Sequence, residues 1–434
     1  MLIKLKIQHI GNNYKLKMSL KRKILWLSNC TFSEEKIKAT GTWIIAMGEA
    51  LIKTGEVELY NISYGNTKTI IRNDCQGINQ WIIPNVKTNS KGLPPQYIID
   101  FIKGVEQEVN PDVIHIWGTE SYWGMLSATN VFSKPVLLEI QGILSTCVSV
   151  FYGGLSNSEL MGCVGLKEII LPQRLFYFRK QEFIKRSRIE KFIISNSPRI
   201  AVQSDWVKAH IKLENENAIL FNAGILLRKE FYVAEPWKRS KNNEVIIFTS
   251  SSGSNMYKGL HVLLRAIAVL KKTIPTIKLH IGGRILFDKI LQDGYSNWLV
   301  KEAKKLGIIN NIEWLGSLTA DEIIYQLQIA SVFVVPSYVE SYCLALAEAM
   351  IIGIPCVASY AGAMPELAED KKSALFFPVG DYTTCASHIQ QIVNDESIAN
   401  HLSIKARASA FKKNNFIDNV KVQLAIYDTI SREL

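Results

Sequence analysis

The sequence lacks several features that would assign its class at once. Its longer uncharged stretches, such as the one from Ala349 to Pro365, are interrupted by glycine and proline, so we expect no membrane span there. The N-terminal segment has no continuous apolar run followed by a small-residue cleavage site, and we expect no secretory signal. There is no Asp-x-Asp triplet and no low-complexity tract.

Cysteine is present but not in a pattern that binds metal or staples a small domain. The chain has 7 cysteines, an odd number, and none is part of a Cys-x-x-Cys pair. Neither a zinc site nor a disulfide framework is indicated, so we expect no metal ligands and a reducing, cytoplasmic setting. The cysteines are Cys30, Cys75, Cys147, Cys163, Cys343, Cys356 and Cys385.

What is present describes a globular protein of more than one domain. The 434 residues suggest two domains of roughly 200 residues each. Hydrophobic residues make up 48%, enough for large cores. The net charge of +11 suggests an anionic partner, which could be nucleic acid, anionic lipid or a phosphorylated small molecule. We find no nucleic-acid-binding module around the basic residues and expect no nucleic-acid partner.

Short apolar runs alternate with amphipathic stretches in both halves, which predicts parallel sheets covered by helices. A helix is expected to begin near Thr42 and end at Gly55. A polar break at Lys229–Asn243 separates two such series, so we predict two doubly wound Rossmann-like domains that face a central cleft. The predicted strands are 24–27, 57–60, 113–117, 136–140 and 199–202, then 245–249, 278–281, 312–315, 332–335, 356–358 and 375–377.

The segment from Pro336 to Asp370 carries the most chemical information. Glu340 and Glu348 lie eight residues apart, just after an apolar strand. A helix starting near Ser341 would leave backbone N–H groups free to bind a diphosphate, and carboxylates accept hydrogen bonds from sugar hydroxyls. The alternatives are a capping box from Ser337 to Glu340 and a solvated position for Glu348. The candidate N–H donors are those of Tyr342, Cys343 and Leu344.

The same segment resembles the signature of glycosyltransferase family 4, retaining nucleotide-sugar transferases with the GT-B fold. That signature joins a Glu-x7-Glu pair to a Gly-x-Pro-x-Val turn and a Gly-x-x-Pro-Glu turn. The resemblance implies an acceptor-binding domain over 1–225, a donor-binding domain over 226–415 and a final helix over 416–434 that packs back on the first domain. The matching residues are Glu340 and Glu348, Gly353-Ile-Pro-Cys-Val-Ala-Ser359 and Gly362-Ala-Met-Pro-Glu366.

Roles can be carried over residue by residue from this resemblance. It assigns Glu340 to the donor sugar, Glu348 to the ribose hydroxyls and Lys258 to the diphosphate, in a donor of UDP or GDP type. Gly41 and Thr42 would lie in a loop where the backbone approaches the donor phosphates. Without the resemblance, Lys258 would be an ordinary surface lysine and Gly41 an ordinary turn.

Three departures from the family pattern matter, one of which is that the glycine pair of the N-domain loop is reduced to Gly41 flanked by threonines. The arginine expected five residues before Lys258 is absent, and backbone amides at Gly253 and Ser254 could replace it as an anion nest. A family histidine is replaced by Gln141, which can donate a hydrogen bond but cannot titrate near neutral pH.

The resemblance implies a metal-independent hexosyltransferase that retains anomeric configuration and acts on a glycan or lipid-linked glycan, in bacterial surface polysaccharide synthesis. One alternative is a catalytically idle relative that binds sugar nucleotide or glycan as a partner subunit, and another is a sugar-nucleotide epimerase. Three residues are associated with the end of a predicted strand: His115, Trp117 and Glu120. We interpret His115 as a core residue and Glu120 as a candidate for the acceptor site.

The stretch Arg174–Phe192 mixes basic and apolar residues. It predicts a basic amphipathic helix that either touches an anionic membrane on the inner face or packs on its own domain.

Overall fold

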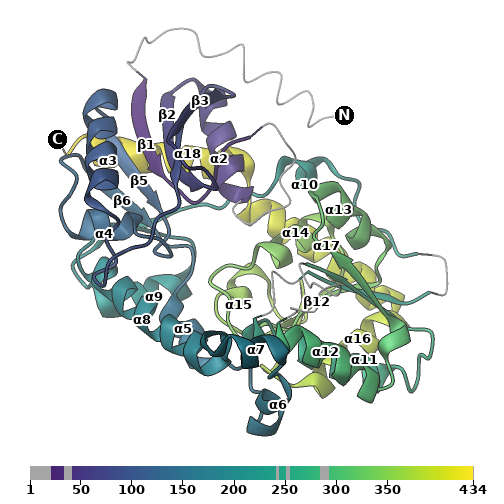
Figure 1. Cartoon of the computed structure of the whole chain (residues 1–434). Helices are drawn as coiled ribbons and strands as arrows, with labels where there is room; N and C mark the ends of the chain where they lie inside the picture. The colour runs from purple at the N-terminus through teal and green to yellow at the C-terminus, as the bar shows by residue number, and fades with distance from the viewer. Residues whose placement is uncertain (1–20, 34–41, 241–243, 251–254, 284–292, 434) are drawn as a thin grey trace.

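The computed structural model of the protein describes residues 21–33, 42–240, 244–250, 255–283 and 293–433. Two sheets, each with its own helices, lie beside one another (Figure 1). We call them, with the helices that cover them, the N-terminal and the C-terminal unit. The predicted α/β class with two doubly wound units is confirmed.

Within the described residues the N-terminal sheet has eight strands in the order β3-β4-β2-β1-β5-β6-β7-β8. All neighbouring strands are parallel except β3 and β4. The sequence pattern missed β3, β4 and β8; β3 is a mostly exposed, polar edge strand and β8 has no buried residue. The strands are β1 (Arg22–Leu27), β2 (Val57–Gly65), β3 (Ile71–Cys75), β4 (Ile78–Pro84), β5 (Val113–Trp117), β6 (Val136–Glu139), β7 (Arg199–Val202) and β8 (Ile219–Asn222).

The C-terminal sheet follows the prediction closely, because its central strands are continuous apolar runs. Six parallel strands in the described part of the chain take the order β11-β10-β9-β12-β13-β14. The division predicted at residues 225 and 226 falls between the two sheets. The strands are β9 (Ile246–Ser250), β10 (Lys278–Gly282), β11 (Ile312–Gly316), β12 (Val332–Val335), β13 (Cys356–Ser359) and β14 (Leu375–Phe377).

Helices follow most strands, as a doubly wound order requires. The helix expected at Thr42 begins there, and Gly55 ends it in a left-handed conformation (φ 72°). The helices are α2 (Thr42–Thr54), α3 (Gln96–Val109), α4 (Trp123–Ala128), α5 (Leu144–Ser149), α6 (Asn157–Gly162), α7 (Leu166–Ile170), α8 (Phe176–Ser195), α9 (Asp205–Glu214), α10 (Lys229–Val233), α11 (Leu260–Leu270), α12 (Gly294–Lys305), α13 (Ala320–Ile329), α14 (Leu344–Ile352), α15 (Met364–Leu367), α16 (Tyr382–Asn394), α17 (Glu396–Lys413) and α18 (Phe416–Ser431).

The last helix, α18, crosses back onto the N-terminal unit, where its yellow ribbon lies among the purple and blue elements (Figure 1). Tyr427 is fully buried, and its hydroxyl accepts a hydrogen bond from Trp26 Nε1 at 2.9 Å. The same hydroxyl hydrogen-bonds His115 Nδ1 at 2.7 Å, and His115 Nε2 lies 3.2 Å from a Glu139 carboxylate oxygen. His115 is therefore a core residue, hydrogen-bonded through Nδ1 and close to the Glu139 carboxylate at Nε2, and Trp117, which stacks on it, is buried as well.

A segment of the N-terminal unit reaches over to the C-terminal core. Residues 144–175, which we call the strap, place Phe151 and Leu155 in the same apolar cluster as β9 and α11. Gly153 O hydrogen-bonds His261 Nε2 at 2.8 Å, and the Gly294 N–H donates to Glu168 at 3.1 Å. The strap thus ties the two units together on the side where α7 lies beside α12 (Figure 1).

A helix does cover most of the stretch Arg174–Phe192 and packs against α4 and α5 of its own unit, as one of the two alternatives predicted, but the prediction that it is amphipathic is wrong. The helix, α8, begins at Phe176, and its apolar side chains do not share one face: Ile193 and Ile194 are buried while Tyr177 and Phe178 are exposed. No helix of the described residues is both long enough and apolar enough to cross a bilayer.

Candidate active site

The loops after β9 and β12 meet at one edge of the C-terminal sheet. These strands are parallel neighbours, so their carboxyl ends lie together, where open α/β sheets bind ligands. The loop after β9 leads to Lys258 in a short 3-10 helix, and the loop after β12 carries Glu340. The Tyr338 N–H donates to the Tyr257 carbonyl at 2.7 Å and ties the loops to each other.

Lys258 and Glu340 form an ion pair in this corner. Lys258 Nζ lies 2.7 Å from Glu340 Oε1, and the Ser337 hydroxyl donates to the same oxygen at 2.7 Å. The two charged side chains are only 22% and 14% exposed. Burial alone would lower the pKa of Lys258, but the Glu340 carboxylate holds it above its usual value. Lys258 is thus a fixed cation at the strand ends, not a solvated surface lysine.

Two glycines of the predicted motifs let the backbone close around this pair. Gly259 follows Lys258 with φ 70°, and a Cβ there would lie 1.9 Å from the Pro336 carbonyl oxygen. Gly362 has φ 55°, and a Cβ there would lie 2.0 Å from the Glu340 carbonyl oxygen, which accepts the Ala363 N–H at 2.8 Å. Any other residue would push the Glu340 loop away from Lys258.

The helix after Glu340 begins later than the sequence suggested. α14 starts at Leu344 instead of near Ser341, because Cys343 adopts a left-handed conformation (φ 80°, ψ 74°) in front of it. The capping box between Ser337 and Glu340 is therefore wrong, although their side chains do bond. Tyr342 lies outside the helix, and its buried hydroxyl accepts a hydrogen bond from Asn414, so only its backbone remains a candidate.

Glu348 is buried in α14 and has a partner that the sequence did not reveal. Arg228 binds it in a bidentate pair, Nε to Oε1 and Nη2 to Oε2, both at 2.8 Å. The guanidinium also lies over the Phe231 ring, 4.7 Å from its centre. Burial raises the pKa of Glu348, and Arg228 opposes that rise. Glu348 is not a solvated helix position, and Arg228 takes up two of the roughly four lone-pair sites of its carboxylate.

The N-terminal unit touches the Glu340 loop directly. The Ser341 hydroxyl donates to the backbone carbonyl of Gln141 at 2.7 Å. Glu366, the last residue of the Gly-x-x-Pro-Glu turn, accepts the N–H groups of Asp205 and Trp206 at 2.8 Å and so caps the first turn of α9 across the interface. The motif therefore also joins the two units, which sequence reasoning did not foresee.

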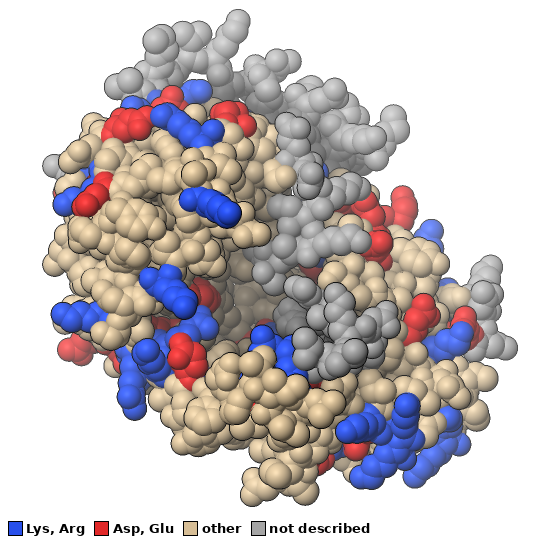
Figure 2. Space-filling model, in the orientation of Figure 1, with Lys and Arg blue, Asp and Glu red and all other residues tan. Residues whose placement is uncertain are grey.

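Between the units the surface is hollowed (Figure 2). A pocket of about 210 Å³ lies between α2 and α13, and its walls include Thr42, Arg228 and Thr319. Thr42, the first residue of α2, borders this pocket, while Gly41, Gly253 and Ser254 lie outside the described residues. Within the described residues no group of three or more His, Cys, Asp or Glu is arranged to hold a metal ion.

Comparison with known sequences finds matches to the C-terminal half of the chain. Residues 234–409 match the sequence model of the family described as glycosyl transferases group 1. The chain is 27% identical over 187 residues to the N-acetyl-alpha-D-glucosaminyl L-malate synthase of Bacillus anthracis, covering 43% of this chain and 44% of that protein. It is 26% identical over 153 residues to the D-inositol 3-phosphate glycosyltransferase of Corynebacterium diphtheriae, covering 35% of each. These alignments thus span less than half of either relative.

Solved structures extend the likeness to the whole fold. A sucrose-phosphate synthase from Thermosynechococcus elongatus superposes with a TM-score of 0.71 at 16% identity, covering 95% of this chain and 100% of that one. An Anabaena protein solved in complex with UDP-glucose superposes with a TM-score of 0.63 at 16% identity, covering 94% and 99%. The GT-B fold and the resemblance to group 1 glycosyltransferases are both confirmed.

Proposed function

We propose, on the premise that residues 234–409 form a group 1 glycosyltransferase domain, that this protein moves a hexose from a nucleotide-sugar donor to a glycan or lipid-linked glycan. The observation that carries the proposal is the Lys258–Glu340 pair, with 2.7 Å between Nζ and Oε1, at the strand ends of that domain and on the loop that leads into α14, the helix of the buried Glu348. UDP is the first nucleotide to test, because a protein of the same fold was solved with UDP-glucose.

Each residue then has a distinct role. The donor diphosphate replaces Glu340 as the ion-pair partner of Lys258. Lys258 then balances the negative charge of the leaving group without a metal. Glu340 is released to accept a hydroxyl of the donor sugar, while Glu348, held by Arg228, accepts the ribose hydroxyls. The bond from C1 to the diphosphate oxygen breaks, the acceptor oxygen bonds C1 on the same face, and its proton leaves with the nucleoside diphosphate.

The acceptor and setting are part of the same proposal. We place the reaction in the cytoplasm, in bacterial surface polysaccharide synthesis, as the family resemblance implies. Contact with an anionic membrane moves from the basic side chains of α8, where Arg186 instead donates to the Glu120 carbonyl at 3.1 Å, to an apolar patch on α6, α7 and the first turn of α8. The patch consists of side chains 48–73% exposed: Met161, Leu166, Ile169, Ile170, Tyr177 and Phe178.

A ligand-dependent stability measurement tests the donor site. UDP at about a hundred times its Kd should stabilise the folded protein by about 2.7 kcal/mol. For a chain of this size that raises Tm by roughly 3 °C. Lys258→Gln and Glu348→Gln should abolish the shift, while Lys278→Gln, a change at an exposed lysine on β10, should leave it intact.

Absence of any shift with UDP, GDP or ADP and their sugar conjugates would contradict the proposal. Binding without hydrolysis of the sugar nucleotide, even over long incubation, would instead support the catalytically idle relative. The absent arginine before Lys258 and the Gln141 substitution make that alternative worth the second assay.

A further inference from the structure

Buried polar atoms without a partner gather at the carboxyl ends of β5, β6 and β7. In folded proteins the large majority of buried polar atoms are hydrogen-bonded. A cluster of buried polar atoms without a partner therefore indicates a place where a ligand can bind. They lie in the N-terminal unit, on the loops that face the Glu340 corner. Four atoms that find no hydrogen-bond partner among the described residues are Glu120 Oε2, Tyr122 Oη, Gln141 Nε2 and Gln203 Oε1.

Glu120 and Gln141 are close neighbours because a glycine stands between them. Gly118 has φ 89°, and a Cβ there would lie 2.0 Å from Glu120 Oε2 and 3.4 Å from Gln141 Cδ. One group is an acceptor and the other a donor, yet they do not bond each other. This pair matches a hydroxyl group, which donates one hydrogen bond and accepts another.

The Glu120–Gln141 pair lies next to the Glu340 corner, and hydrogen bonds to Glu190 fix the loops that carry it. The Gln141 carbonyl accepts the Ser341 hydroxyl, one residue from Glu340. Behind it, Glu190 accepts the Thr119 hydroxyl at 2.8 Å and the Leu144 N–H at 2.8 Å, which fixes the loops after β5 and β6.

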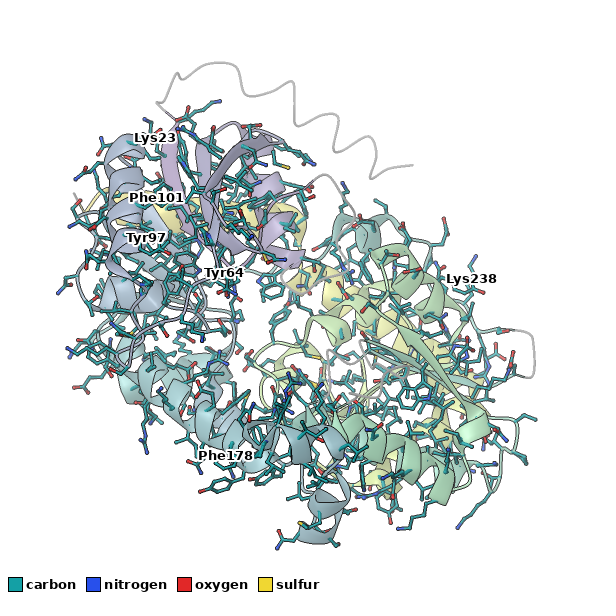
Figure 3. All side chains as sticks on the ribbon, in the orientation of Figure 1. Lys23, Tyr64, Tyr97, Phe101, Phe178 and Lys238 are labelled. Carbon is teal, nitrogen blue, oxygen red and sulfur yellow. The ribbon has the colours of Figure 1, made fainter. Side chains whose placement is uncertain are left out.

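Aromatic side chains form the adjoining wall. Tyr64 stacks on Trp123 with ring centres 5.8 Å apart, and Tyr122 lies 4.5 Å from Trp123. Figure 3 shows Tyr64 on the side of the N-terminal unit that faces the C-terminal unit. Burial and then the Glu120 carboxylate raise the pKa of Tyr64, so these two side chains are near each other. Flat aromatic faces suit the C–H faces of a sugar ring.

The charge of the corner argues against an anionic ligand. Glu120 and Glu190 are both carboxylates, and Arg186 is occupied by the Glu120 carbonyl and lies 5.7 Å from the Phe183 ring centre. A phosphate or carboxylate placed here would face two acids, and Arg186, the cation whose charge acts on Glu120, already donates to a backbone carbonyl.

We infer that Glu120, Tyr122 and Gln141 bind hydroxyl groups of an uncharged sugar ring beside C1 of the donor. This inference rests on the proposed function and names the class of its substrate. The ring is either the accepting sugar or the donor's own sugar, since both present the same hydroxyl chemistry at this point.

The test uses the full chain and the variants Glu120→Gln, Tyr122→Phe and Gln141→Leu, with Tyr325→Phe at an exposed site of α13 as the matched control. Titration with UDP and UDP-glucose reports on the donor sugar. Saturation-transfer NMR and transfer assays with neutral methyl glycosides, and with the same glycosides as 6-phosphates, report on the acceptor.

If the ring belongs to the acceptor, the variants keep donor affinity within twofold, while binding and transfer of neutral glycosides fall by about tenfold or more. If it belongs to the donor, the variants lose about tenfold in affinity for UDP-glucose but not for UDP. Unchanged values in all three variants, no binding of neutral glycosides with unchanged donor affinity, or a preference of the wild type for the phosphorylated glycosides would overturn the inference. Failure of UDP to bind the wild type would instead refute the proposed function.

Discussion

At the scale of single residues, the buried carboxylates decide how the protein responds to pH. Burial raises the pKa of Glu190 to about 7, against the hydrogen bonds from Leu144 N–H and the Thr119 hydroxyl that lower it. Because this value exceeds that of the unfolded chain, near 4.3, the folded state holds an extra proton between them. Stability is then fully present below about pH 4 and falls as pH rises towards 7, by up to about 4 kcal/mol.

We therefore expect Glu190→Gln to flatten the pH dependence of Tm between about pH 5 and 7.5, and to be more stable than the wild type at pH 8. The glutamine carbonyl can still accept the Leu144 N–H, and its amide can donate to Thr119 Oγ1. Glu182→Gln, at an exposed position of the same helix, is the control and should follow the wild-type curve. Parallel curves for wild type and Glu190→Gln would show that Glu190 is not the group responsible.

At the scale of elements, the strap depends on one glycine of the C-terminal unit. A Cβ on Gly294 would lie 1.7 Å from the Cys163 carbonyl oxygen and 2.9 Å from a Glu168 carboxylate oxygen. Gly294→Ala should therefore lift the strap from α12, lower stability by about 1–3 kcal/mol and expose residues 157–175 to limited proteolysis.

The matched change, Gly104→Ala in the middle of α3, has open space around the new Cβ. It should raise stability by roughly 0.5–1 kcal/mol, since alanine favours a helix interior. Stability changes of opposite sign for the two substitutions would confirm that contact with the strap is decisive. A Gly294→Ala variant with wild-type stability and wild-type resistance to proteolysis would contradict it.

Elements built from local pattern could be predicted from the sequence, and those built from distant contacts could not. The run Val332–Val335 is apolar on both faces and forms a buried central strand, and the glycines at 353 and 362 stand where left-handed turns need them. By contrast, Arg228 meets Glu348 across 120 residues of sequence, and β3 carries no apolar run because it is a sheet edge. The late start of α14 depends on the left-handed backbone conformation of Cys343, which could not be predicted from a cysteine at that position.

At the scale of the whole molecule, the positive charge and the apolar patch at residues 161–178 suggest how the protein meets its acceptor. Phe178 lies on the lower rim of the molecule, pointing away from the gap between the units (Figure 3). Lys167 and Arg174 belong to the same segment, and Lys180 closely follows it, so an anionic bilayer would meet cations and apolar side chains together.

The patch predicts binding to vesicles of phosphatidylcholine with about a third phosphatidylglycerol at low salt, and weaker binding to phosphatidylcholine alone. Ile169→Ser with Ile170→Ser removes apolar area worth about 1 kcal/mol or more of membrane affinity, so the bound fraction in co-sedimentation should fall at least about fivefold. The matched double variant, Leu213→Ser with Ile219→Ser, changes exposed apolar residues elsewhere on the N-terminal unit and should bind like the wild type. Equal loss in both double variants, or no binding by the wild type, would mean that the patch does not face a membrane and that the acceptor reaches the cleft from solution.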